Sequence, residues 1–338
     1  MKALVMHGPG IVTIEDVPEP VRKPGEALLR VRRVGLCGTD LSSYRGRNPL
    51  VSYPRIPGHE IAATIVELPE EAHGLRTGMD VTLSPYTCCN DCASCRNQRP
   101  NACQCNQTMG VQRDGALAEY IRVPVEKLYT AQLGLTELCL VEPLTVGFHA
   151  VARAQVTPQD VAVIFGCGGV GLGAVAASAF RNAITVAIDV DDDKLEIARR
   201  AGATHTIHSR RQEIAPILAE LTGGNGPDVI IEAVGMAQTF RSAVELVSFT
   251  GRVVYIGYAK EEVSYETKSF VQKELDIRGS RNALPEDFRQ VIRMLERGHF
   301  PVDATVSRIA PLEEAPALLK AWDANPAAFT KIMLTLDT

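Results

Sequence analysis

The sequence has few aromatic residues, no excess of basic charge and no run of apolar residues long enough to cross a membrane. Aromatic residues make up 5% of its 338 residues. Lys and Arg total 35 against 40 Asp and Glu, so the net charge of −5 leaves no basic field for nucleic acid. The start, MKALVMHGPG, is too short an apolar stretch for a signal peptide, and no segment reaches the roughly 20 apolar residues of a membrane helix. We therefore expect a cytoplasmic protein that binds neither nucleic acid nor membrane.

The composition and the pattern of apolar residues predict two domains. Hydrophobic residues make up 46% of the chain and charged residues 22%, as in soluble globular proteins, and the length exceeds one ordinary core. Residues 1 to about 150 carry short apolar runs broken by Pro and Gly, which indicates a β-rich domain with long loops. From Thr157 to Gly279, continuous apolar runs such as Val161–Phe165 alternate with helix-length segments, which indicates a parallel sheet built from βαβ units.

A glycine-rich motif opens this βαβ region. The segment GCGGVG directly follows the expected strand VAVIF and begins a helix of small residues, which is the context that a dinucleotide-binding turn requires. The first glycine allows the tight turn, the second lets the backbone approach a pyrophosphate, and the last lets helix and strand pack closely. The residues expected to bind the cofactor here are Gly166, Gly168, Gly169, Val170 and Gly171.

Asp189 lies at the expected end of the next strand. Its carboxylate can accept hydrogen bonds from both hydroxyls of the adenosine ribose. A 2′-phosphate would instead meet Asp189 and the three aspartates that follow Val190, without an adjacent arginine. The sequence therefore predicts NAD rather than NADP, with Val190 and Lys194 as further cofactor contacts.

Six of the nine cysteines fall between residues 88 and 105. In a reducing compartment, such clustering favours metal binding over disulfides. The spacing C-x2-C-x2-C-x7-C supplies four thiolates, enough for a closed tetrahedral zinc site that stabilises a loop without doing chemistry. Cys88 and Cys105 are left over, and Cys88 is an alternative to the first ligand. The expected ligands are Cys89, Cys92, Cys95 and Cys103.

Three further segments complete a resemblance to a known family. They are GLCGTD from Gly35, GHE from Gly58 and VEPL from Val141. Together with the four-cysteine segment and the glycine-rich motif, and in this order along essentially the whole chain, they resemble the zinc-containing medium-chain alcohol and polyol dehydrogenases, in the branch of sorbitol, threonine and sugar-acid dehydrogenases. The resemblance implies a zinc- and NAD-dependent oxidoreductase with one catalytic and one structural zinc per chain.

The resemblance also implies the ligands of the catalytic zinc. In that family the cysteine of the first segment and the histidine of the second bind this metal, which carries over to Cys37 and His59. Glu142 resembles a glutamate that replaces a cysteine in the polyol branch and acts directly or through a water. Glu60 is a further candidate ligand that would swing in during turnover.

The proton relay and the substrate contacts rest on the same resemblance. Thr39 matches the hydroxyl residue that takes the substrate proton, but Ser42 stands where the family often has a histidine, so the proton would leave through water or another group. The polyhydroxy substrate expected first is a sugar acid such as L-galactonate, with a polyol or a free sugar as alternatives. Candidate substrate contacts are Tyr44, Arg45, Arg47 and Asn282, and further candidate cofactor contacts are Val234, Gly235, Ile256, Ser280 and Arg281.

The resemblance implies an α/β architecture of two domains. A GroES-like catalytic domain is expected from residues 1–150 and 285–338, and a Rossmann domain with a doubly wound parallel sheet from residues 151–284. It also implies a homodimer or homotetramer, for which the strand Arg252–Ile256 and the segment after it form a candidate pairing edge.

Three other functions stay open at this stage. A threonine or simple alcohol dehydrogenase of the same family would share these motifs. A zinc-free, NADPH-using quinone reductase of the same superfamily would lack the metal ligands, and Cys37, His59 and Asp189 argue against it. A catalytically silent NAD-binding scaffold would keep only the structural zinc. The number of bound zinc ions separates the dehydrogenases, with two per chain, from the scaffold, with one, and from the reductase, with none.

Overall fold

The structure is a computed structural model that describes residues 1–72 and 74–336. The chain divides into two compact units. Unit 1 consists of Met1–Glu142 and Val302–Thr338, and unit 2 consists of Pro143–Pro301. The chain therefore leaves unit 1 once and returns to it after unit 2.

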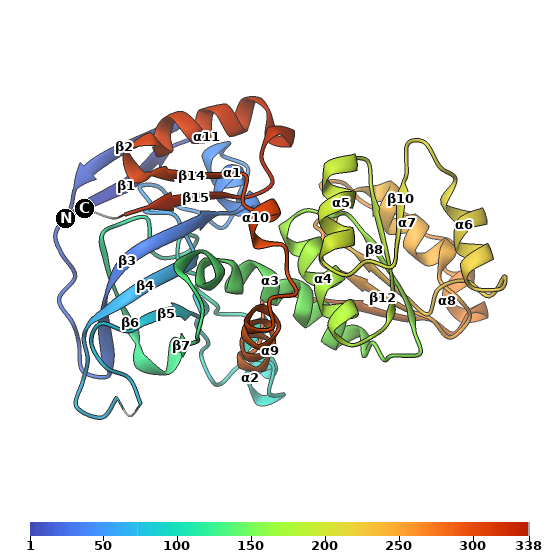
Figure 1. Cartoon of the computed structure of the whole chain (residues 1–338), viewed down its shortest axis with the longest axis horizontal. Helices are drawn as coiled ribbons and strands as arrows, with labels where there is room; N and C mark the ends of the chain where they lie inside the picture. The colour runs from blue at the N-terminus through green and yellow to red at the C-terminus, as the bar shows by residue number, and fades with distance from the viewer. Residues whose placement is uncertain (73, 337–338) are drawn as a thin grey trace. The chain divides into compact units, whose positions relative to one another are not determined.

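Unit 1 is a β-rich unit. Its strands are β1 (Lys2–Gly8), β2 (Ile11–Asp16), β3 (Glu26–Leu36), β4 (Glu60–Glu67), β5 (Asp80–Leu83), β6 (Tyr120–Pro124), β7 (Leu128–Thr130), β14 (Arg308–Pro311) and β15 (Ile332–Thr335). β1 and β2 form a hairpin, and a second sheet has the order β14-β15-β3-β4-β5-β7, with β6 also paired with β3. Figure 1 shows the red C-terminal strands beside the blue β3, because β15 pairs antiparallel with β3. Both ends of the described chain thus build one unit.

The long strand β3 shows why these residues form a sheet over a core. Ala27, Leu29 and Val31 are fully buried, and the residues between them are half-buried, which is the alternation of a strand with one face on the core. Short helices follow the strands at several turns. They are α1 (Gly38–Tyr44), α2 (Ala93–Arg96), α10 (Val302–Thr305) and α11 (Ala315–Ala324).

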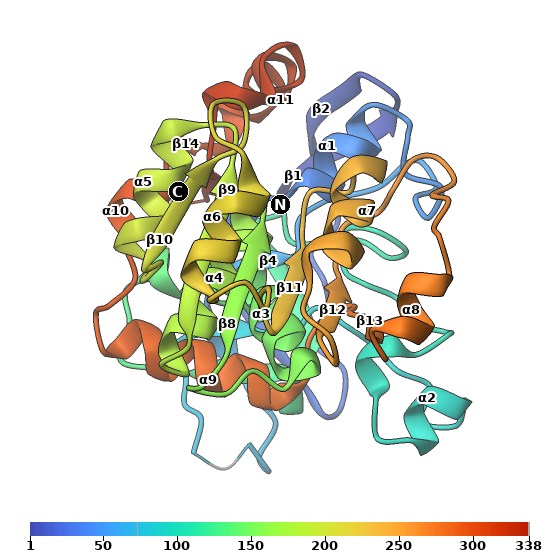
Figure 2. The same ribbon diagram turned by 90° about the vertical axis from the view of Figure 1, so that its right-hand side faces the viewer.

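Unit 2 is a six-stranded parallel sheet with helices between its strands. The strands are β8 (Val161–Phe165), β9 (Ile184–Asp189), β10 (His205–His208), β11 (Val229–Glu232), β12 (Arg252–Tyr255) and β13 (Asp276–Gly279). The helices are α4 (Gly169–Phe180), α5 (Asp192–Arg200), α6 (Ile214–Leu221), α7 (Ala237–Leu246), α8 (Lys268–Gln272) and α9 (Pro285–Glu296). The order β10-β9-β8-β11-β12-β13, visible in part in Figure 2, reverses direction between β8 and β11. In sheets of this kind, ligands bind beyond the carboxyl ends of the strands at that reversal.

The unit boundaries differ from those expected from the sequence. They lie at 142/143 and 301/302 rather than at 150/151 and 284/285. The helix α9, expected in the catalytic domain, belongs to unit 2. Its Asp287 lies 2.9 Å from Nδ1 of His149, and both side chains are buried. This buried polar pair, together with the apolar residues of α9, ties the helix to the parallel-sheet unit.

The helix α3 (Leu135–Ala154) contains the first of these boundaries. Among the described residues it is one helix that is long and apolar enough to cross a membrane, although the sequence was expected to contain no such segment. Within the fold, 72% of its apolar window is buried, and Glu142 and Pro143 lie in its interior. These features identify α3 as a core helix.

Candidate metal and cofactor sites

Cys37, His59 and Glu60 come together because β3 and β4 pair side by side. Gly35 of β3 lies opposite Glu60 of β4, so the residues just beyond each position meet at the same end of the two strands. The candidate ligand atoms of the three residues all lie within 4.8 Å of one another. His59 is 5% exposed and Glu60 1% exposed, so the cluster is largely closed to water.

The side chain of Asp40 supports both Cys37 and His59. It accepts hydrogen bonds from the backbone N–H of Cys37 at 2.8 Å and of Gly58 at 3.3 Å. Burial raises the pKa of Asp40. Its Oδ1 lies 3.9 Å from Nδ1 of His59. Burial disfavours the charged imidazole, but Asp40 and the thiol of Cys37 outweigh this effect and raise the pKa of His59 well above its ordinary value.

Glu142 lies on α3 and interacts electrostatically with His59 and Glu60, but it is not among the residues whose ligand atoms lie within 4.8 Å of one another. It is 4% exposed, and the Tyr86 hydroxyl donates a hydrogen bond to its Oε1. Burial raises the pKa of Glu142 to about 7, and the nearby His59 opposes that rise. Burial, followed by the charge of Glu142, also raises the pKa of Tyr86 well above its ordinary value. Sequence reasoning missed Tyr86, and the one signal that could have pointed to it is its position three residues before Cys89.

Glu60 is held by a lysine from the other end of the chain. Lys331 Nζ lies 2.7 Å from both carboxylate oxygens of Glu60, and both residues are buried. A Cβ on Gly35 would lie 2.0 Å from Oε2 of Glu60, so only glycine leaves room for this pair. Glu60 would have to leave Lys331 to act as a metal ligand. Nothing in the sequence linked residues 60 and 331, which are far apart in the chain.

The donor set of this cluster fits a zinc ion. A thiol, an imidazole and a carboxylate are the ligand types of catalytic zinc, and three protein ligands leave a fourth position open. Nδ1 of His59 is buried and has no hydrogen-bond partner among the described residues. A divalent cation bound here would favour the ionised forms of Asp40 and Glu142, which burial alone disfavours.

The four expected lobe cysteines form a second cluster. The Sγ atom of Cys92 lies 3.5 Å from Sγ of Cys95 and 3.7 Å from Sγ of Cys103. The Sγ atom of Cys103 lies 3.5 Å from Sγ of Cys89. Zinc at about 2.3 Å from four tetrahedral sulfurs sets them roughly 3.8 Å apart. These separations therefore fit a closed zinc site. Hydrogen bonds from the Ser94 hydroxyl and backbone N–H groups lower the pKa of Cys92, which favours the thiolate that zinc needs.

Cys88 and Cys105 lie outside this tetrahedral group. Cys88 is half-buried, with its Sγ 3.1 Å from Oδ1 of Asn90, and Cys105 is exposed. The structure thus places Cys89 rather than Cys88 among the four clustered thiols, which resolves the alternative left open by the spacing.

The glycine-rich turn in unit 2 has the close contacts expected of a dinucleotide-binding loop. Gly166 has φ +92°, and a Cβ on Gly171 would lie 1.8 Å from the carbonyl oxygen of Gly166. Gly168 precedes α4 as its N-cap, with open space where a Cβ would be. A ligand phosphate at this point would meet backbone N–H groups at the start of α4, near Gly169 and Val170.

Asp189 ends β9, and its carboxylate is oriented by two backbone groups. It accepts hydrogen bonds from the N–H of Cys167 and of Val190, both at 2.7 Å. Each carboxylate oxygen has a second lone pair, which a ribose hydroxyl can use. Asp191 caps α5 by accepting hydrogen bonds from the backbone N–H of Asp193 and Lys194.

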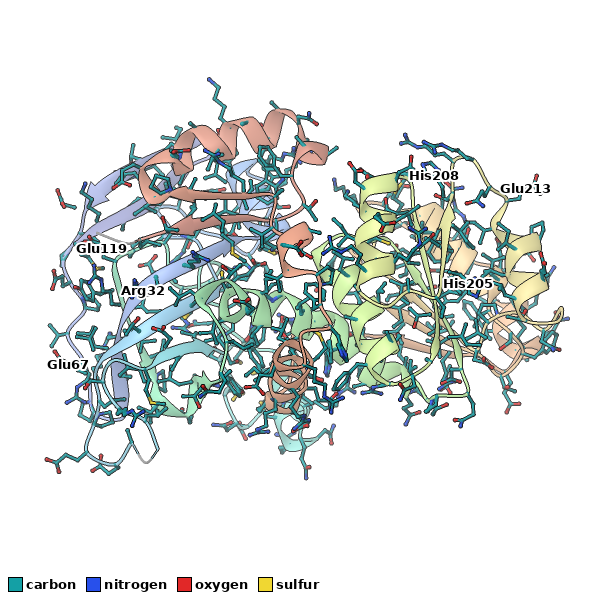
Figure 3. All side chains as sticks on the ribbon, viewed as in Figure 1. Arg32, Glu67, Glu119, His205, His208 and Glu213 are labelled. Carbon is teal, nitrogen blue, oxygen red and sulfur yellow. The ribbon has the colours of Figure 1, made fainter. Side chains whose placement is uncertain are left out.

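The structure corrects one step of the argument for NAD. His208, labelled in Figure 3, ends β10 opposite Asp189, and Arg211 follows three residues later. Arg211 lies 2.8 Å from the Asp192 carboxylate, so an arginine is adjacent in space although not in the sequence. This guanidinium is already paired with an aspartate, and Asp189 remains the acidic group at the strand end.

The other candidate cofactor residues cluster beyond β11, β12 and β13. A Cβ on Gly166 would contact Val234 at 2.8 Å, so the loops after β8 and β11 adjoin. Gly235 has φ +82°. Ile256 follows β12, and Ser280 follows β13 and is buried, with Arg281 next to it. Sequence reasoning missed Glu232, which is fully buried and accepts hydrogen bonds from the N–H of Val234 and Gly235.

The candidate substrate residues have different surroundings. Tyr44 is part of the core of unit 1, and the Arg45 guanidinium lies 2.5 Å from the Asp323 carboxylate. These two side chains are therefore engaged by the protein itself. Arg47 is exposed, and Asn282 lies in unit 2 with φ +52°. Of the relay residues, Thr39 accepts a hydrogen bond from the Cys37 thiol at 3.7 Å, and Ser42 lies half-buried on α1.

Comparisons with known proteins agree with this arrangement. Residues 23–132 match the family described as alcohol dehydrogenase GroES-like domain, and residues 169–297 match the zinc-binding dehydrogenase family. L-Galactonate-5-dehydrogenase of Escherichia coli K12 is 33% identical, over 92% of this chain and 92% of that protein. A short chain alcohol dehydrogenase of E. coli CFT073, solved with NADH, has 26% identity and a TM-score of 0.91 over 99% of both chains. A zinc-binding dehydrogenase of Sinorhizobium meliloti 1021, solved with NADP, has 27% identity and a TM-score of 0.90 over 99% of this chain and 98% of that one.

The chain belongs to the zinc-containing medium-chain alcohol and polyol dehydrogenases. Its two units have the GroES-like and Rossmann folds of that family, and it is an enzyme of the alcohol dehydrogenase type that uses zinc and a nicotinamide cofactor.

Proposed function

We propose that this enzyme oxidises a secondary alcohol of a polyhydroxy substrate with NAD, at a zinc held by Cys37, His59 and Glu142. The observation that carries the proposal is the cluster of Cys37, His59 and Glu60, whose candidate ligand atoms lie within 4.8 Å of one another. Glu142 is buried and hydrogen-bonded to Tyr86, and the family resemblance gives it the place of a cysteine ligand in ordinary alcohol dehydrogenases. Glu60 would be a transient ligand, because Lys331 holds it in the present arrangement. The enzyme would carry a second zinc in the four-cysteine lobe.

The residues of unit 1 would bind and orient the reacting groups. When bound, zinc supplies a Lewis acid that lowers the pKa of the substrate alcohol and so favours hydride loss. Asp40 would orient the imidazole of His59. The Thr39 hydroxyl, beside Cys37, would take the proton of the substrate hydroxyl. Since Ser42 is a poor base near neutral pH, the proton would pass on to water or another group.

The substrate class is proposed from chemistry and from one relative. A carboxylate ligand makes the site more polar than a cysteine would, which favours a substrate with many hydroxyls. The similarity to an L-galactonate-5-dehydrogenase supports a sugar acid, with polyols and free sugars as the next candidates. Arg47 is an exposed guanidinium in unit 1 that could pair with a substrate carboxylate. Threonine and simple alcohols are the alternatives within the family.

A substrate panel tests this proposal. We expect NADH formation, followed at 340 nm, with one polyhydroxy class among aldonates, polyols, sugars, threonine and simple alcohols. Turnover of simple alcohols alone would overturn the substrate class. Absence of turnover from protein that binds only one zinc per chain would favour the NAD-binding scaffold.

We expect Asp189→Ser to change the cofactor preference. Hydrogen bonds to a charged group are worth about 1.5–3 kcal/mol, so losing those to the ribose lowers kcat/KM with NAD by about 10- to 100-fold. Use of NADP rises relative to NAD because the repulsion of a 2′-phosphate is removed. The matched control is Glu220→Gln, an exposed carboxylate at the end of α6 in the same unit, which keeps the wild-type preference. Wild-type protein that used NADP as efficiently as NAD would contradict the assignment.

We also propose that the enzyme is a homo-oligomer that pairs through β13. The expected edge, Arg252–Ile256, is wrong in detail, because β12 is hydrogen-bonded to both β11 and β13. β13 instead ends the sheet, and Ile277 is 40% exposed. Antiparallel pairing of two copies about Ile277 would set Asp276 of each opposite Arg278 of the other, which matches opposite charges.

The oligomeric state tests this pairing. Sedimentation at micromolar concentration should give at least a dimer for the wild type and a smaller species for Ile277→Asp, because the substitution places a charge at the centre of the contact. A monomeric wild type, or an unchanged Ile277→Asp variant, would rule out pairing through this edge.

The thiol-rich metal sites further favour a reducing compartment such as the cytoplasm.

A further inference from the structure

Tyr86 connects the four-cysteine lobe of unit 1 to the helix α3, two segments that are far apart in the sequence. It lies in the loop after β5, three residues before the first lobe cysteine, and is 6% exposed. Its hydroxyl donates a hydrogen bond to Oε1 of Glu142, which belongs to α3. The residue that precedes the four-cysteine lobe therefore touches a candidate ligand of the other metal site.

A hydrogen bond to one oxygen of a carboxylate restricts the rotation of the group and so favours one direction for its second oxygen. Outer hydrogen-bond partners of metal ligands act in this way and affect metal affinity strongly. We propose that Tyr86 is a positioning residue, whose hydroxyl sets the orientation in which Glu142 meets a metal bound by Cys37 and His59. This inference rests on the proposed function.

The loop that carries Tyr86 is itself fixed to the far end of the lobe. The N–H of Gln107 donates to Oγ1 of Thr87 at 2.7 Å, and the Thr87 hydroxyl donates to the carbonyl of Gln107 at 3.2 Å. The N–H of Met109 donates to the carbonyl of Pro85 at 3.1 Å. The residues on either side of Tyr86, Pro85 and Thr87, are thus hydrogen-bonded to the segment that follows the last lobe cysteine. The lobe therefore acts on the position of Glu142 through Tyr86.

The experiment measures metal affinity rather than turnover. Metal-free wild type and Tyr86→Phe are titrated with Co²⁺, whose visible absorption separates a four-thiolate site from a site with one cysteine, one histidine and one glutamate. We expect Tyr86→Phe to weaken binding at the second site by about 10- to 100-fold and to change its absorption bands, with lobe binding unchanged. The matched control is Tyr120→Phe, which removes a hydroxyl from β6 of the same unit and keeps wild-type affinity.

A second variant tests the role of the lobe. Thr87→Val removes the hydrogen bonds to Gln107 without removing a thiol, and we expect a smaller loss of Co²⁺ affinity at the Glu142 site. Combined with Tyr86→Phe, it should cause no further loss, because both changes act through the same contact. Additive losses would show that the lobe acts by another route.

The outcomes separate this inference from the proposed function. Wild-type affinity and absorption in Tyr86→Phe would overturn the positioning role while leaving the proposed zinc site intact. A wild type that binds Co²⁺ only at the four thiolates would overturn the proposed function and this inference together. An unchanged circular dichroism spectrum of Tyr86→Phe would assign its loss of affinity to the contact rather than to unfolding.

Discussion

Replacing Cys37 with Ala should abolish turnover. The substitution removes the thiolate of the cluster and with it the metal that would lower the pKa of the substrate alcohol. Such Lewis-acid catalysis is worth several kcal/mol, and each 1.36 kcal/mol is a tenfold change in rate, so we expect a loss of at least about 1000-fold in kcat. The measurement is NADH formation with the substrate that the panel identifies, together with the number of zinc ions per chain.

The control for this prediction is Cys105→Ala. It removes an exposed thiol outside both ligand clusters and should keep wild-type turnover and zinc content. Cys37→Ala should keep the lobe zinc and lose the other. If the kcat of Cys37→Ala were within tenfold of the wild-type value, this cluster would not be the catalytic site.

Replacing Lys331 with Met should destabilise unit 1. The carboxylate of Glu60, 2.7 Å from Lys331 Nζ, outweighs the opposing effect of burial and raises the pKa of Lys331, which favours the charged lysine. Removing one partner of a buried ion pair leaves the other charge uncompensated, which costs about 3–5 kcal/mol. The measurement is urea unfolding followed by circular dichroism, in which the transition of unit 1 should move to lower urea.

A double variant distinguishes the charge effect from loss of packing. Lys331→Met combined with Glu60→Gln removes both charges and should recover much of the lost stability, because no unpaired carboxylate remains. A single variant Lys331→Met that unfolds at the wild-type urea concentration would show that the pair does not stabilise unit 1. A double variant as unstable as the single one would assign the loss to packing.

Local patterns predicted the fold class and the motif-based parts of the sites. The strand expected at Val161–Phe165 occurs with those bounds. A continuous apolar run that ends at a glycine-rich turn is typical of a parallel strand buried on both faces. The four lobe cysteines cluster as their spacing predicted, since they lie within one loop. Cys37 and His59 meet because the strands next to them pair. Before the structure, only the family resemblance indicated that these two residues lie together.

Contacts between distant segments could not be predicted in this way. Lys331 reaches Glu60 and Arg211 reaches Asp192 only after the sheets have formed, and no local pattern marks either residue. Helix α9 was expected in the wrong unit, because its partner His149 lies more than 130 residues earlier in the chain. Tyr44 was expected at the substrate, but an aromatic side chain near a polar motif can equally fill the core.

Zinc titration of the metal-free enzyme tests the central claim most directly. Zinc bound per chain and NADH formation at 340 nm are recorded together as zinc is added. The account predicts two bound zinc ions per chain, with turnover that appears as the site at Cys37, His59 and Glu142 fills and that is absent when only the lobe is filled. Full turnover without zinc, or with zinc in the lobe alone, would contradict it.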